Sequence, residues 1–160
     1  MFMVYINDMI EGVNSYINLF ADDAKLLRRV RNREDGEMLQ EDLNNIAKWS
    51  DKWEVEFNVN KCKVMEFSKG RNRITTNYCL GSTQLSKTKQ EKDLGVTIQD
   101  NLTPDRHINK ITGEAYNLIR SIKAAFTSVD EEMMKKLIVS MIRPKLEYAA
   151  VVWSPHKKKM

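Results

Sequence analysis

The order of apolar and polar positions divides the chain into a part with short strands around one long helix, followed by a helical part. Apolar runs at 16–20 and 24–30 predict the two strands of a hairpin around Ala21-Asp22-Asp23. From about residue 33 to 53 the apolar side chains recur every three or four positions, which predicts an amphipathic helix. Further strands are predicted at 54–59, 62–68, 78–80, 83–85 and 94–98.

The helix predicted at 33–53 has an apolar stripe and an acidic remainder. Either Asn32 or Asp35 would cap its first turn, where acidic side chains suit the helix dipole. We expect Asp42 to lie away from the stripe, on the same side as the other acidic residues of this helix. The stripe itself is formed by Leu39, Leu43, Ile46, Ser50 and Trp53.

The second part of the chain begins with a clear helix signal at Thr103-Pro104, since Thr caps helices and Pro suits their first position. One apolar stripe then continues to about Phe126. Residues 128–131 (Ser-Val-Asp-Glu) have the form of a capping box and predict a second helix through Met141, with an interruption at Pro144. The fold class is therefore α+β, with a sheet-and-helix part at 1–99 and a helical part at 100–160.

Charge and composition narrow the possible functions only a little. The 160 residues carry a net charge of +4, and residues 34–56 are acidic whereas 57–99 and 100–160 are basic. A basic surface that meets phosphates and a scatter of solubilising lysines both remain open. Two cysteines without a CxxC spacing make neither a disulfide framework nor a zinc site, and favour an intracellular protein, nuclear or cytoplasmic rather than secreted. No uncharged apolar run is long enough to span a membrane, so no membrane is expected as a partner.

The sharpest chemical feature is the pair of adjacent carboxylates, Asp22 and Asp23, at the predicted hairpin tip. Magnesium prefers carboxylate oxygens and completes its shell with water and substrate phosphates. Phosphoryl transfer by two metal ions needs carboxylates from at least two strands, with the ions about 3.5–4 Å apart. The alternative is an ordinary exposed turn, in which Asp is common.

Several segments in order resemble the reverse transcriptases of non-LTR (LINE-type) retrotransposons, most of all the jockey and CR1 groups. Phe20-Ala21-Asp22-Asp23 is similar to the active-site box of that family, an aromatic and any residue before Asp-Asp. The resemblance covers nearly the whole chain and is carried further by Tyr5-Ile6-Asn7-Asp8, Trp49, Trp53, Phe57-Asn58, residues 61–67, Asp93-Leu94-Gly95-Val96, His107-Ile108, residues 143–148 and Trp153-Ser154-Pro155.

This resemblance implies an RNA-directed DNA polymerase in the full-length parent, with two Mg²⁺ ions, an RNA template, a DNA primer and deoxynucleoside triphosphates. It implies the C-terminal part of the palm with the primer grip at 1–99 (an antiparallel sheet with helices on one face) and the helical thumb at 100–160. Its site residues would be the metal ligands Asp22 and Asp23, the general acid Lys61, the primer grip Leu94-Gly95-Val96 and the phosphate contacts Lys110, Arg120 and Lys123.

The pattern of the family also requires an aspartate on an earlier strand and a nucleotide-binding helix, and neither precedes Tyr5. We therefore expect a fragment, since the chain starts inside an apolar segment, and we expect it to be inactive by itself. The hairpin should then have an unpaired edge and uncovered apolar surface. Two other hypotheses remain: a non-catalytic nucleic-acid-binding module, and a retrotransposon remnant without function.

Overall fold

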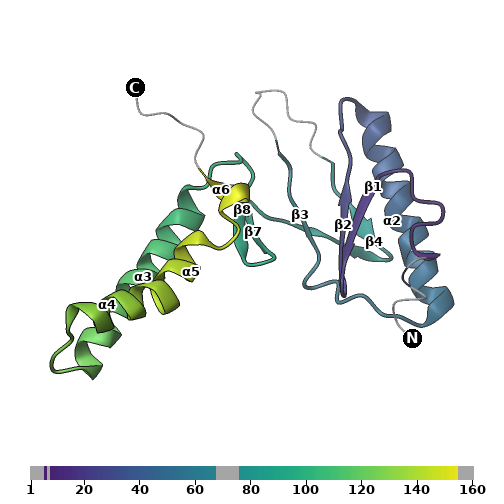
Figure 1. Cartoon of the computed structure of the whole chain (residues 1–160). Coiled ribbons are helices and arrows are strands. Elements are labelled where there is room, and N and C mark those ends of the chain that lie inside the picture. The colour runs from purple at the N-terminus through teal and green to yellow at the C-terminus, as the bar shows by residue number, and fades with distance from the viewer. Residues whose placement is uncertain (1–5, 7, 68–75, 155–160) are drawn as a thin grey trace. The chain divides into compact units, whose positions relative to one another are not determined.

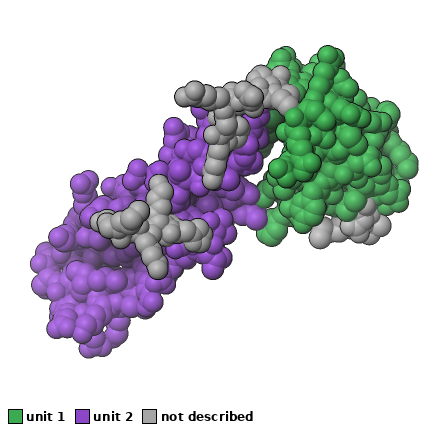
Figure 2. All heavy atoms as spheres, turned by 90° about the horizontal axis from the view of Figure 1, so that it is seen from above, with its two compact units in different colours: residues 1–64, 68–88 green, residues 65–67, 89–160 purple. Residues whose placement is uncertain are grey.

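The structure, a computed structural model, describes residue 6 and residues 8–67 and 76–154. Contacts along the backbone divide the chain into two units (Figure 2). Unit 1 comprises residues 1–64 and 68–88, and unit 2 comprises residues 65–67 and 89–160. The hairpin at 90–99 therefore belongs to the same unit as the C-terminal helices.

In its described residues, unit 1 contains one long helix and six short strands. The helix runs beside the first hairpin (Figure 1). The strands pair as β1 with β2, β3 with β6 and β4 with β5, and only the β3–β6 pair is parallel. The elements in chain order are β1 (Tyr16–Phe20), β2 (Asp23–Leu27), α2 (Arg33–Trp53), β3 (Lys63–Val64), β4 (Cys79–Leu80), β5 (Thr83–Gln84) and β6 (Ser86–Lys87).

The hairpin β1–β2 forms because its apolar side chains alternate between two faces. On the inner face the cross-strand pair Ile17 and Leu26, together with Leu19, packs against the core that contains Ile46 and Trp49 of α2. Helix α2 thus supports the hairpin from one side. This confirms the predicted hairpin and the predicted helix at 33–53.

The outer face of the hairpin is apolar and exposed. Tyr16, Phe20 and Leu27 are 67%, 59% and 45% exposed. Among the described residues, β1 and β2 form a ladder only with each other, so each strand has one unpaired edge. In the part of the chain that the structure describes, the hairpin thus has the unpaired edge and the exposed apolar surface expected from the sequence.

Helix α2 begins and ends through specific backbone contacts. The side chain of Asn32 accepts a hydrogen bond from the Asp35 N–H at 2.8 Å, so Asn32 is the cap. At the other end Glu54 has φ +53°, and its N–H donates to the carbonyl of Ser50. Two strand predictions that follow the helix were wrong: residues 55–58 form no strand, and the strand expected at 62–68 is reduced to β3 in the residues described.

Unit 2 joins one hairpin to a series of helices. The strands β7 and β8 are antiparallel, and α3 packs against both β8 and the later helices. The elements are β7 (Gln90–Asp93), β8 (Val96–Gln99), α3 (Asp105–Ala125), α4 (Glu131–Leu137), the π-helical turn η1 (Ile138–Ile142), α5 (Arg143–Glu147) and α6 (Ala150–Trp153).

Helix α3 starts where the sequence predicted, but a different residue caps it. Thr103 makes no cap bond to the helix, and its hydroxyl bonds to Asn101 instead. The N-cap position is Pro104, which offers no side-chain acceptor, and the capping bond comes from Gln99 at the end of β8, whose side-chain oxygen accepts from the N–H of Arg106 at 2.9 Å. This bond joins the strand to the first turn of the helix, and satisfies a donor that no residue of the helix can satisfy.

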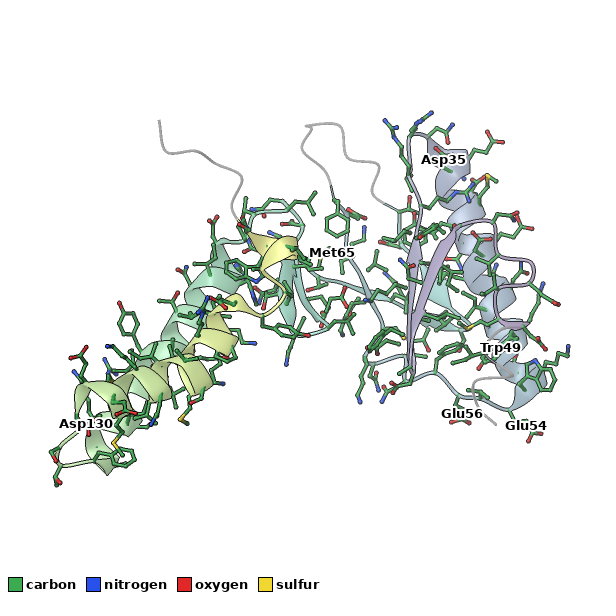
Figure 3. The ribbon with its side chains drawn as sticks, viewed as in Figure 1. Asp35, Trp49, Glu54, Glu56, Met65 and Asp130 are labelled. Atoms are coloured by element: carbon green, nitrogen blue, oxygen red, sulfur yellow. The ribbon has the colours of Figure 1, made fainter. Side chains whose placement is uncertain are left out.

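The second predicted helix is interrupted before its expected end. Its cap is Asp130, labelled in Figure 3, which accepts from the Met133 N–H at 2.7 Å, so the capping box expected from Ser128 is not formed. The helix widens into η1 just before Pro144. Proline has no N–H and its ring clashes with the carbonyl four residues earlier, and a π-turn relieves that clash.

At the level of fold class the structure confirms α+β, because helices and small sheets are largely segregated along the chain. The strands described form four two-stranded sheets, not one antiparallel sheet. A search of the described residues finds no helix with the length and apolar character needed to cross a membrane. The assignment of palm and thumb, with its boundary between 99 and 100, stays a prediction.

Candidate functional site

The two acidic residues singled out in the sequence lie at the turn of the β1–β2 hairpin. Phe20 and Asp23 form its last cross-strand pair, so Ala21 and Asp22 are the two residues of the turn. Asp22 and Asp23 are both exposed. Ala21 adopts φ +52°, a conformation that costs a residue with a side chain about 1–2 kcal/mol.

Two exposed carboxylates are an incomplete set of ligands for a pair of metal ions. Among the described residues, no three His, Cys, Asp or Glu side chains are grouped closely enough to hold an ion. When one or two carboxylates bind magnesium, water molecules and phosphate oxygens supply most of its other ligands. Asp22 and Asp23 fit a contribution to such a site, but the described residues do not form a complete two-metal site.

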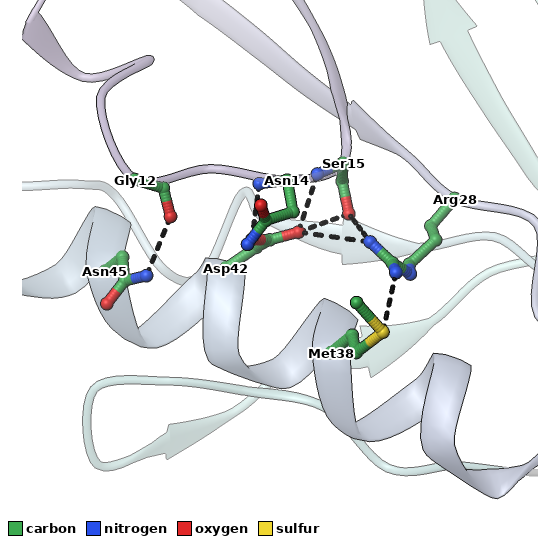
Figure 4. Close-up of polar contacts among 7 residues, drawn as sticks. All are labelled: Gly12, Asn14, Ser15, Arg28, Met38, Asp42 and Asn45. Atoms are coloured by element: carbon green, nitrogen blue, oxygen red, sulfur yellow. Dashed lines mark hydrogen bonds and ion pairs between the residues drawn. The ribbon is translucent and has the colours of Figure 1, made fainter.

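A buried carboxylate, Asp42, fixes the root of the same hairpin to α2 (Figure 4). Its side chain has no exposed surface. The N–H groups of Asn14 and Ser15 donate to its two oxygens, each at 2.8 Å, and the Ser15 hydroxyl donates to Oδ2. One turn along the helix, the Asn45 side chain donates to the carbonyl of Gly12 at 2.8 Å. The segment that leads into β1 is thereby held along the helix.

Arg28, which follows β2, completes this cluster. Its guanidinium lies 3.7 Å from Oδ2 of Asp42, and it also donates to the Ser15 hydroxyl at 3.3 Å. Both ends of the hairpin therefore converge on one carboxylate. The sequence prediction that Asp42 lies away from the buried side of α2 was wrong. Asp42 precedes Ile46 by four residues and Trp49 by seven, and this spacing puts all three on one face of the helix.

Lys61, the expected general acid, lies in an exposed turn before β3. Its N–H donates to the carbonyl of Asn58 at 2.9 Å, which closes that turn. No hydrogen bond or ion pair connects the Lys61 side chain with Asp22 or Asp23 in the part of the chain that the structure describes. Its role in catalysis stays a prediction.

Leu94-Gly95-Val96, the expected primer grip, lies at the turn of the β7–β8 hairpin in unit 2. Asp93 and Val96 are its last cross-strand pair, and Val96 is buried. Leu94 was expected to begin the strand predicted at 94–98, but it is a turn residue and 44% exposed. Leu94 and Gly95 have φ +44° and +89°. Two successive residues with positive φ are typical of tight hairpin turns, so a turn stands where the sequence predicted the start of a strand.

The expected phosphate contacts Lys110, Arg120 and Lys123 are all exposed on α3. Lys110 lines an open depression between the β7–β8 hairpin and the start of α3, and the other two do not. Two cations that the sequence analysis did not single out, Lys92 and Arg106, line it as well. The remaining lining residues are Gln90, Glu91 and Thr97. Three cations against one carboxylate make this depression suited to a phosphate group.

Comparisons with known proteins give one informative similarity. The chain is 29% identical over 141 residues to the RNA-directed DNA polymerase from mobile element jockey of Drosophila funebris. The aligned region covers 86% of this chain and about 15% of that polymerase. No protein-family model matches the chain, and no solved structure matches it significantly. The similarity supports a relation between this chain and the reverse transcriptases of non-LTR mobile elements.

Proposed function

We propose that the chain is a portion of an RNA-directed DNA polymerase of a mobile element, with part of the palm at 1–99 and the thumb at 100–160. In the full-length parent, Asp22 and Asp23 would contribute carboxylate ligands to Mg²⁺ during nucleotidyl transfer. The observation that carries the proposal is the position of these two adjacent acids at the tight turn of a hairpin whose inner face packs against α2. The similarity to the jockey polymerase supports it independently.

The exposed side of the hairpin fits this proposal. A hairpin that belongs to a larger sheet needs a neighbour along its edge and a cover for its apolar face, and β1–β2 has neither among the described residues. We propose that other segments of the parent pair with this edge and bring the further carboxylate that the metal site needs. The chain by itself is then expected to show no template-dependent synthesis in a primer-extension assay with Mg²⁺.

An exchange of segments tests the proposal in an active context. The 141 aligned residues of the jockey polymerase are replaced by the matching residues of this chain, and RNA-templated DNA synthesis by the chimera is measured. We expect synthesis above that of a chimera that carries a scrambled segment of equal composition. A folded chimera without activity would contradict the proposal.

A second candidate function, nucleic-acid binding without catalysis, is favoured by the cationic depression of unit 2. Its test is fluorescence anisotropy of a labelled RNA–DNA duplex with the chain at increasing salt. Lys110→Gln should weaken binding and lower the salt slope by about one, the contribution of one phosphate contact. Lys48→Gln, on the exposed side of α2 in the other unit, is the matched control.

Substitution of the acidic pair distinguishes the two candidates. A binding module should hold the duplex equally well or more tightly with Asp22→Asn, because the substitution removes a negative charge from a chain that binds phosphates. The same substitution in the chimera should abolish synthesis if the carboxylate is catalytic. Loss of synthesis without loss of binding would therefore favour the polymerase.

A further inference from the structure

The turn between β7 and β8 has a backbone conformation that its own residues do not favour. Leu94 lies in the left-handed region at φ +44°, which costs a residue with a side chain about 1–2 kcal/mol. Conformations of this kind persist only where the surroundings hold them in place. Besides the β7–β8 ladder that closes it, this turn has a contact with a residue 54 positions further along the chain.

That residue is Tyr148, which follows α5. Its hydroxyl donates a hydrogen bond to the carbonyl of Leu94 at 3.0 Å. Its ring lies against Gly95, where an added Cβ would come within 2.9 Å of Cε1. Two separate features therefore favour glycine at position 95: its φ of +89° and the proximity of the Tyr148 ring.

Tyr148 is itself held in position by side chains of unit 2. The indole N–H of Trp153 donates to the carbonyl of Tyr148 at 2.7 Å. The Trp153 ring lies 5.4 Å, centroid to centroid, from the imidazole of His107. The Nδ1 of His107 accepts from the Thr97 N–H at 3.2 Å, on β8. The contacts thus link β8 to α3, α3 to α6, α6 to Tyr148, and Tyr148 back to the β7–β8 turn.

The turn and the tyrosine remain accessible despite these contacts. Leu94 is 44% exposed and Tyr148 is 56% exposed, so a ligand can contact both. We propose that Tyr148 is a positioning residue that fixes the Leu94–Gly95 turn for recognition of a primer 3′ end. This inference rests on the proposed function and on the resemblance that assigns Leu94-Gly95-Val96 to the primer grip.

The test compares two nucleic acids and two tyrosine variants of the full chain. Both probes are RNA–DNA hybrids of equal paired length, one with a recessed DNA 3′ end and one with blunt ends. We expect the unmodified chain to bind the recessed end more tightly. Tyr148→Phe removes one hydrogen bond and should reduce that preference about 3- to 10-fold, with blunt-end affinity unchanged. Tyr116→Phe, an exposed tyrosine of α3, is the matched control and should change neither affinity.

Hydrogen exchange of the amides of residues 94–97 supplies a second measurement that does not depend on binding. In Tyr148→Phe these amides should exchange faster, whereas Tyr116→Phe should leave them unchanged. An unchanged exchange rate, or an unchanged preference for the recessed end in Tyr148→Phe, would overturn the inference. A wild-type chain that binds the two hybrids equally well would overturn the primer grip itself, and the inference with it. That result differs from one in which the wild type prefers the recessed end and Tyr148→Phe leaves this preference unchanged.

Discussion

In each unit, a single buried polar side chain connects several elements through its contacts. In unit 1 the carboxylate of Asp42 accepts from two main-chain N–H groups and a hydroxyl, and it faces one guanidinium. Such a group is costly to bury and is tolerated only because all of these donors converge on it. Its removal leaves those donors unpaired, so the effect extends to the hairpin that carries Asp22 and Asp23.

Asp42→Asn should destabilise unit 1 by about 3 kcal/mol, because a partly exposed guanidinium and two main-chain donors lose a fully buried, charged acceptor. Glu41→Gln, one position earlier and exposed, should change the stability by less than about 0.5 kcal/mol. Urea unfolding measures both effects. Hydrogen exchange at Tyr16–Leu27 should accelerate only in Asp42→Asn, and equal effects of the two variants would contradict the role assigned to Asp42.

We expect His107 to make the stability of unit 2 dependent on pH. Burial lowers the pKa of this imidazole, with a smaller contribution from Lys110, while Glu114 acts in the opposite direction. The unfolded chain therefore takes up the proton more readily than the folded chain, so stability is full above pH of about 6.5 and falls as the pH drops below it. Protonated Nδ1 also loses its capacity to accept from Thr97.

The measurement is the urea midpoint of unit 2 between pH 7.5 and 5, for the wild-type chain and for His107→Asn. Asparagine keeps an acceptor at a similar position but does not titrate. The wild type should lose stability on acidification more steeply than the variant. Parallel pH profiles of the two proteins would show that His107 does not carry the effect.

At the scale of elements, the β1–β2 hairpin combines a strong local signal with a strained turn. Its alternating side chains fix which face meets α2, and this fixes the position of the two acids at the turn. The strain lies at Ala21, whose φ is positive. Natural two-residue turns usually place glycine or asparagine at such positions.

Ala21→Gly should stabilise unit 1 by about 0.5–1 kcal/mol, because glycine adopts this φ without a steric penalty. Ala24→Gly, at an exposed position within β2, is the matched control and should destabilise by a similar amount. Thermal unfolding of the three proteins gives the comparison. A lower melting temperature for Ala21→Gly than for the wild type would contradict the description of the turn.

The elements that the sequence predicts well are those with several consecutive periodic positions. Helix α2, helix α3 and the β1–β2 hairpin fall close to their expected bounds for that reason. Two-residue strands such as β3 and β4 are too short to produce a periodic pattern. The cap of α3 was missed because Gln99 reaches it from a strand, outside the usual capping pattern.

At the scale of the whole molecule, the sequence predicted where the two acids lie on the hairpin but not the contacts between distant segments. The acids at the hairpin turn follow from a local motif, and the structure places both there. The contact between Tyr148 and Gly95 joins distant segments and has no local signature. The described residues form no complete metal site, and the aligned region covers about 15% of the jockey polymerase.

The central claim is that Asp22 is a catalytic carboxylate in a polymerase. The most direct measurement is the rate of RNA-templated DNA synthesis by the chimeric jockey polymerase with Asp22→Asn, beside Asp51→Asn on the exposed side of α2. The account predicts a loss of at least about 100-fold for Asp22→Asn, since a metal ligand contributes several kcal/mol to transition-state stabilisation. Asp51→Asn should stay within about twofold of the parent chimera. Equal rates for the two variants would contradict the account.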